Sequence, residues 1–156
     1  MKGGEKMGIK KRPIQVTLFC IFLIILCVSL FSTWGYQAVQ HLLSTYFDVQ
    51  TESTSYDVFI GIIGMIGSAL IVTGSIMLWN MKKKGSSFMM LGATAFIIKN
   101  ILDIINDVVP LTRLAQVTSE NITDASWKIG WDLFQIAFWI FIMVFFNRKS
   151  FKTTLS

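Results

Sequence analysis

Charged residues are scarce in this chain. They make up 15% of its 156 residues, whereas a soluble domain carries about 25%. Histidine occurs once and cysteine twice. Cys20 and Cys27 lie seven residues apart in one apolar run, where they share a helix face but cannot reach each other. His41 has no second ligand at a spacing typical of metal sites. The two thiols are therefore expected to be small packing residues, and the sequence predicts no metal site.

Motifs for catalysis are also missing. The sequence contains no phosphate-binding glycine loop, no metal-ligand cluster, no cofactor motif and no nucleophile placed beside a base. Aspartates alone can do acid–base chemistry, but no second functional group accompanies them. We therefore expect a protein that is not an enzyme and that uses no cofactor.

What the chain does have is long apolar runs, with a mean hydropathy of +0.61. Four runs reach the roughly 20 residues needed to cross a bilayer: 14–36, 58–80, 88–109 and 127–146. Stretches such as FCIFLIILCVSLF are continuous rather than alternating, which is typical of spanning helices and not of barrel strands. We predict an all-α fold, an integral membrane four-helix bundle. It forms a single domain over 14–146, between basic tails at 1–13 and 147–156.

The first run follows basic residues, as a signal peptide would. It is too long for a signal core, and no small-x-small cleavage site follows it. We expect it to be an uncleaved first span.

Basic and acidic residues fall on opposite sides of the predicted spans. Eleven of the 14 basic residues lie in the tails or in the 82–84 turn: Lys2, Lys6, Lys10, Lys11, Arg12, Lys82, Lys83, Lys84, Arg148, Lys149 and Lys152. The other two loops hold Asp48, Glu52, Asp57, Glu120 and Asp124. The positive-inside rule then predicts that both termini are cytoplasmic. The Ile-, Phe- and Lys-rich composition favours a bacterial inner (plasma) membrane. The net charge of +5 reflects topology and attraction to the lipid bilayer, and no nucleic-acid partner is expected.

Polar residues interrupt the third and fourth runs at helical spacing. A charge in hydrocarbon costs several kcal/mol. Lys99, Asp103 and Asp107 must therefore form ion pairs, contact water or take part in the function of the protein. At 100° per residue, Asp103 and Asn106 fall within about 40° of Lys99, and Asp107 and Asn100 at about 80° and 100°. The fourth run carries a second stripe at i, i+4, i+7 and i+11, formed by Lys128, Asp132, Gln135 and Trp139.

The depths of the two stripes match. Because the two helices run antiparallel through a short loop, Asp107 lies level with Lys128, and Asp103 with Asp132. We expect Lys128 to contact Asp107, and Lys99 to contact Asp103 or Asp132, which leaves one acid over. The predicted ligand or ion pocket comprises Lys99, Asn100, Asp103, Asn106, Asp107, Lys128, Asp132, Gln135 and Trp139.

Small residues mark the expected helix contacts, because packing in lipid depends on close backbone approach. The packing positions are Gly61, Gly64, Ser68, Ser75, Gly92 and Ala95. The Lys82–Gly85 turn predicts that the second and third spans are antiparallel neighbours. Residues 37–47 carry an apolar stripe that fits either an extension of the first helix or a helix lying on the membrane surface.

Two functions fit this pattern. Either an outward-facing charged pocket between the third and fourth helices binds or transports a small polar or ionic solute, or the protein is a non-catalytic scaffold, assembly or immunity-type protein whose buried charges fix packing and partner docking. The clustered charges and the surplus acid favour the first, and the absence of charge in the first two spans favours the second.

The four-span plan is similar to that of small multidrug exporters, but the glutamate those require in the first span is missing, and we assign no family. A second copy of the chain or another membrane protein is a compatible partner in both cases.

Overall fold

The computed structural model describes residues 14–47, 55–113 and 119–147 and consists of four helices. They are α1 (Ile14–Phe47), α2 (Ser55–Trp79), α3 (Lys84–Arg113) and α4 (Ser119–Asn147). All four are long and apolar enough to cross a membrane, and the described residues contain no strand. The predicted all-α four-helix membrane fold is therefore confirmed, and the chain is a multi-pass membrane protein. The predicted basic tails, apart from Asn147, lie outside the described residues.

The α2–α3 connection is a tight turn closed by backbone hydrogen bonds. Met81 adopts a φ of 57°, the left-handed conformation that commonly ends helices. Its N–H donates to the carbonyl of Leu78, and the Lys82 N–H donates to the carbonyl of Met77, each over 2.9 Å. This pattern satisfies the last carbonyls of α2 and turns the chain back, so α2 and α3 lie antiparallel as the sequence predicted.

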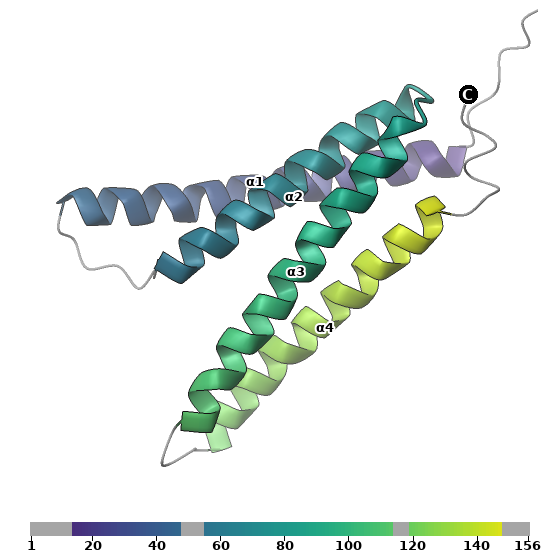
Figure 1. Cartoon of the computed structure of the whole chain (residues 1–156). Helices are drawn as coiled ribbons and strands as arrows, with labels where there is room; N and C mark the ends of the chain where they lie inside the picture. Colours follow the sequence, from purple (N-terminus) through teal and green to yellow (C-terminus); the bar gives the residue numbers. More distant parts are fainter. Residues whose placement is uncertain (1–13, 48–54, 114–118, 148–156) are drawn as a thin grey trace, which may run out of the picture.

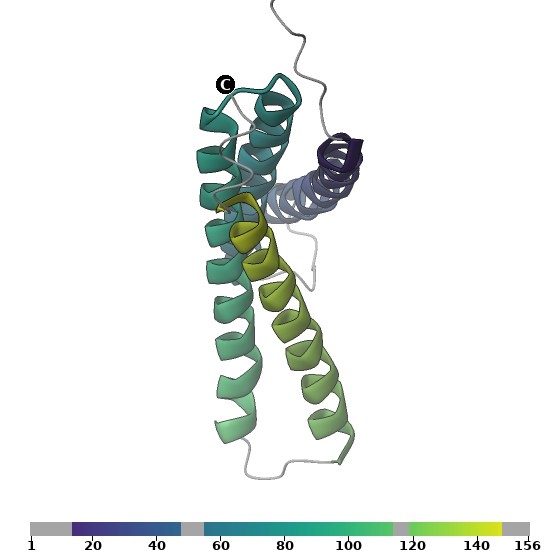
Figure 2. The ribbon, with the colours of Figure 1, turned by 90° about the vertical axis from the view of Figure 1, so that its right-hand side faces the viewer.

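Each helix packs against its neighbour in the chain: α1 on α2, α2 on α3 and α3 on α4. The helices lie close together at the end that holds the 82–84 turn, and toward the opposite end α1 and α2 diverge from α3 and α4 (Figure 1). We term these the basic end and the acidic end, the latter carrying Asp57 and Asp107. In the view turned by 90°, α4 also leans away from α3 toward the acidic end (Figure 2). The bundle is therefore tightest at its basic end.

Helix lengths exceed the predicted spans, mostly at the acidic end. The 34 residues of α1 make a helix of about 50 Å, longer than the roughly 30 Å hydrocarbon core. Residues 37–47 therefore extend the first helix and do not form a separate surface helix. Likewise α2 begins at Ser55 and α4 at Ser119, ahead of the predicted 58 and 127. Tyr56 and Asp57 are thereby part of a helix rather than of a loop.

Glycines bring the backbones of α2 and α3 into contact. A Cβ built on Gly74 would lie 2.9 Å from the carbonyl oxygen of Gly85 and from the amide nitrogen of Met89. A Cβ on Gly85 would lie 2.7 Å from the carbonyl oxygen of Gly74. At the next contact toward the acidic end, a Cβ on Gly92 would lie 2.8 Å from the carbonyl oxygen of Gly67. Only glycine permits so close an approach.

Most of the predicted packing positions lie at such contacts. Gly61 and Gly64 face Trp34 of α1, and a Cβ on Gly64 would come within 2.5 Å of the indole ring. Ser68 and Ser75 are fully buried, Gly92 is buried and Ala95 is half-buried. The small residues thus hold α2 against both of its neighbours.

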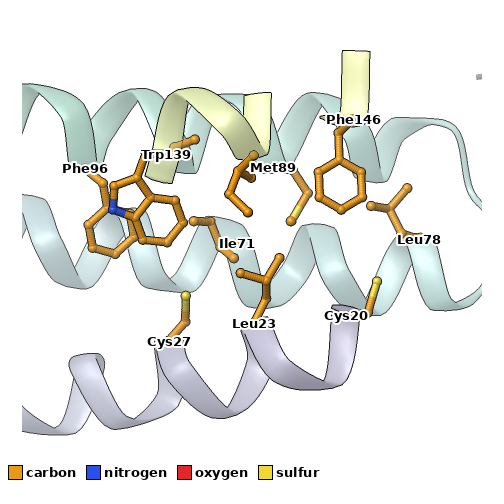
Figure 3. Close-up of a cluster of buried hydrophobic side chains, with 11 residues drawn as sticks. Cys20, Leu23, Cys27, Ile71, Leu78, Met89, Phe96, Trp139 and Phe146 are labelled. Carbon is orange, nitrogen blue, oxygen red and sulfur yellow. The ribbon is translucent and has the colours of Figure 1, made fainter. Parts of the chain in front are cut away.

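The hydrophobic core fills the basic half of the bundle (Figure 3). From α1, Cys20, Leu23 and Cys27 point toward the core side chains of the other helices, and both thiols are free and completely buried. The other members come from α2, α3 and α4, and they are Ile71, Leu78, Met89, Ala93, Phe96, Trp139, Ile142 and Phe146. Phe19 of α1 meets the rings of Phe145 and Phe146 of α4, with centroids 5.3 and 5.8 Å apart. This half of the bundle is therefore mostly apolar.

Candidate functional site

A charged pocket of about 220 Å³ lies at the acidic end. It is lined by α2, α3 and α4 through Tyr56, Asp57, Asp103, Asn106, Asp107, Lys128, Trp131 and Asp132. Pockets for drug-sized ligands span roughly 300–1,000 Å³. The pocket therefore suits a ligand smaller than a typical drug molecule.

Helix periodicity explains why these side chains meet. On α3 the lining residues follow the spacing i, i+3, i+4, and on α4 Lys128, Trp131 and Asp132 repeat it, so each set occupies one helix face. The stacked rings of Phe96 and Trp139 fix the register between the two helices. Seven residues further toward the acidic end on each helix stand Asp103 and Asp132. This matched register places both carboxylates on the same pocket.

One ion pair anchors the base of the pocket. The Nζ of Lys99 lies 2.5 Å from Oδ2 of Asp103, one turn along α3, and the two side chains are 10% and 21% exposed. The same ammonium lies 5.5 Å from the centre of a Trp34 ring on α1, a distance typical of cation–π attraction. Of the two acids predicted as partners of Lys99, the structure selects Asp103.

The predicted contact between Lys128 and Asp107 is not formed. Both residues line the pocket, but within the described residues neither takes part in an ion pair. Asp132 is 8% exposed and also has no ion-pair or hydrogen-bond partner in this part of the chain. The charges of α3 and α4 therefore share one volume instead of neutralising each other in pairs.

An aromatic layer forms the floor beneath this pocket. Phe96 of α3 stacks on Trp139 of α4, with centroids 4.2 Å apart and ring planes 4° apart. Trp34 of α1 also meets Phe96, with ring centroids 5.5 Å apart. Trp139 was predicted to be a pocket residue, but it belongs to the core and is 2% exposed. The layer of Trp34, Phe96 and Trp139 is the part of the apolar core that lies nearest to the charged pocket.

Two buried polar groups near the pocket have no partner within the described residues. Asn100 is completely buried, and neither its amide nitrogen nor its carbonyl oxygen is hydrogen-bonded. It shares one stripe of α3 with Phe96, Asp103 and Asp107, so it projects into the bundle between the aromatic layer and the pocket. The Tyr56 hydroxyl oxygen, on the pocket wall, is also buried and unpaired. Buried polar groups are rarely left unsatisfied, so both are candidates to bind a ligand.

The structure brings five of the nine predicted pocket residues together: Asp103, Asn106, Asp107, Lys128 and Asp132. Lys99, Asn100, Gln135 and Trp139 stand closer to the basic end and do not line the pocket.

Three lining residues were not predicted: Tyr56, Asp57 and Trp131. A signal for Asp57 was available, since an acidic residue is favoured in the first turn of a helix, where it lies here. Trp131 follows the same face of α4 as Lys128 and Asp132, so the helical period of that stripe was the available signal for it.

Fold and site together define the class: a helical multi-pass membrane protein with a charged pocket among three of its helices. Comparison of the chain with protein-family models, curated proteins and solved structures finds no match. Any function assigned to the pocket must therefore rest on its own geometry and charge.

Proposed function

We propose that the protein binds or transports a small polar or ionic solute at this pocket, and that the pocket faces the outside of the cell. The observation that carries the proposal is the shared pocket itself, where four aspartates and one lysine from three helices surround about 220 Å³. Ionisable side chains inside membrane proteins mark solute or ion sites more often than not, because burying them is costly.

The main rival is a scaffold or immunity-type protein in which the charges only fix helix packing. Such a role predicts that each buried charge has an opposite partner across a helix interface. Instead, the ion pair between Lys99 and Asp103 lies within α3, and Asp107, Lys128 and Asp132 have none among the described residues. Charges that bridge no helices cannot fix the register of α3 on α4. The solute function therefore accounts better for their placement.

The aromatic layer would block transport in this conformation but would not block binding. Phe96 and Trp139 are 1% and 2% exposed and stack face to face beneath the pocket. A solute bound above them has no polar route through the apolar basic half. Transport would require the layer to separate, by a movement of α1 or α4 against α3, whereas binding requires none.

Asp132→Asn is expected to weaken solute binding at least tenfold and to leave the unliganded protein folded. A hydrogen bond to a charged group is worth about 1.5–3 kcal/mol, which corresponds to tenfold or more in affinity. The measurement is thermal unfolding in lipid nanodiscs against a panel of small cations, anions and neutral solutes, since a ligand stabilises the state that binds it.

Asp124→Asn is the matched control for this prediction, because Asp124 is exposed on the same helix and does not line the pocket. This variant should retain the full response to the solute. If Asp132→Asn instead prevents accumulation of the protein in the membrane, the packing interpretation is correct.

Cysteine labelling tests the proposed orientation. Cys20 and Cys27 are completely buried and should not react with a membrane-impermeant maleimide. Asn106→Cys places a thiol on the pocket wall and is expected to be labelled in intact cells. Lys83→Cys, in the exposed α2–α3 turn, should be labelled only after permeabilisation. The opposite pattern would reverse the orientation and leave the pocket itself in place.

A further inference from the structure

We infer that the pocket selects a small organic cation, one whose positive group donates several N–H hydrogen bonds, such as a primary ammonium or an amidinium. This inference rests on the proposed function and adds the sign and the chemical class of the solute.

The charge of the lining is the first argument. Four aspartates face one lysine around the pocket, and Lys99, which lies beneath it, is already paired with Asp103. Asp107 and Asp132 have no ion-pair partner in the described part of the chain. An anion would add to this surplus of negative charge, and a cation reduces it. Charge complementarity therefore favours a cation.

The hydrogen-bonding groups point the same way. Ionised carboxylates only accept hydrogen bonds, and the unpaired hydroxyl oxygen of Tyr56 on the pocket wall can accept as well. A ligand that satisfies this set must present several donors. An ammonium or amidinium group does so, whereas a carboxylate or phosphate ligand would face four carboxylates and find Lys128, the Asn106 amide and the Tyr56 hydroxyl as donors.

Size and aromatic lining distinguish an organic cation from a metal ion. A volume of about 220 Å³ is far more than a bare ion needs. Trp131 and Tyr56 contribute rings to the wall, and rings attract ammonium and guanidinium-like groups through their faces. The described residues contain no group of three or more acidic, histidine or cysteine side chains placed to hold a metal ion.

The protein already contains one example of this recognition. At the base of the pocket the Lys99 ammonium binds the Asp103 carboxylate and lies 5.5 Å from a Trp34 ring centre. On the pocket wall, Asp132 and Trp131 offer the same two chemical groups, a carboxylate and an indole, and no lysine of the described chain pairs with Asp132. A ligand ammonium would complete the second copy of this arrangement.

Three nearly isosteric probes test the sign of the charge: acetamidinium, acetamide and acetate. The full chain is reconstituted in nanodiscs, and thermal unfolding is followed with each probe at matched ionic strength. We expect acetamidinium alone to raise the melting temperature, and Asp132→Asn to weaken its binding at least tenfold, while Asp124→Asn has no effect. If acetate or acetamide stabilises the protein and acetamidinium does not, the cation inference is wrong and the proposed function stands. If none of the three probes stabilises the protein, and no solute of the wider panel does so, both the cation inference and the proposed function are wrong.

Lys128→Met provides an independent test, because the substitution should change the affinity for a cation and the affinity for an anion in opposite directions. Lys128 is exposed and has no ion pair within the described residues, so its replacement should leave the fold intact. Removing this positive charge should strengthen acetamidinium binding by about three- to tenfold, because repulsion across the pocket is lost. A pocket built for anions would instead lose affinity for acetate in this variant, and that result would overturn the inference.

Discussion

Asparagine in place of Asp103 is expected to destabilise the protein by about 3–5 kcal/mol. The substitution leaves the ammonium of Lys99, a residue that is 8% exposed, without the carboxylate that it binds in the structure. Removing the ion-pair partner of a buried charge is among the costliest single changes in a folded protein. The measurement is the free energy of unfolding by denaturing detergent in mixed micelles.

The double variant Lys99→Met, Asp103→Asn should recover most of that loss. With both charges removed, no uncompensated ion remains beside the Trp34 ring, and an apolar pair often replaces a buried ion pair at little cost. Asp107→Asn is the matched control, because Asp107 lies one turn further along α3 and makes no ion pair in the described part of the chain. It should change the stability by less than about 1 kcal/mol. If Asp103→Asn and Asp107→Asn had equal effects, the ion pair would not stabilise the fold.

Alanine at Gly74 and alanine at Gly130 are expected to change stability in opposite directions. At Gly74 the added methyl group would lie 2.9 Å from backbone atoms of α3, and these cannot move unless the two helices separate. Overpacking of this kind costs about 1–3 kcal/mol. At Gly130 a methyl group meets nothing within 4 Å, and alanine is favoured over glycine in a helix by up to about 1 kcal/mol.

The comparison uses thermal unfolding of both variants in the same lipid mixture. A larger residue at each position should widen the difference: Gly74→Leu is expected to prevent stable folding, while Gly130→Leu is tolerated. Equal losses for the two alanine variants would mean that the α2–α3 backbone contact is not formed in the membrane.

The stripe positions on α3 and α4 were predictable because the helical period fixes which side chains share a face. Counting turns from the loop was enough to place Asp103 level with Asp132, and Asp107 level with Lys128, and all four line one pocket. The sequence could not decide the partner of Lys99. Asp103 lies one turn away on the same helix, so that pair forms without any help from α4.

Other features depended on packing that no periodicity encodes. Gly61 and Gly64 signalled a close approach, but not that the indole of Trp34 would fill the space beside them. Trp139 continued the polar stripe of α4 in sequence, yet it stacks on Phe96 and joins the core, because an indole gains more from burial than from the pocket. Tyr56 and Asp57 reached the pocket because α2 begins at Ser55, three residues before the expected span.

The aromatic layer also determines how this protein would respond to the electrical potential across a membrane. Moving one elementary charge through the whole field is worth about 2.3 kcal/mol per 100 mV. A cation bound above Phe96 and Trp139, as proposed, would have entered from one face and would still have the mostly apolar basic half of the bundle to cross. Its occupancy should therefore depend only weakly on voltage. Any step past the stacked rings would cross most of the remaining drop, so voltage dependence would belong to passage and not to binding.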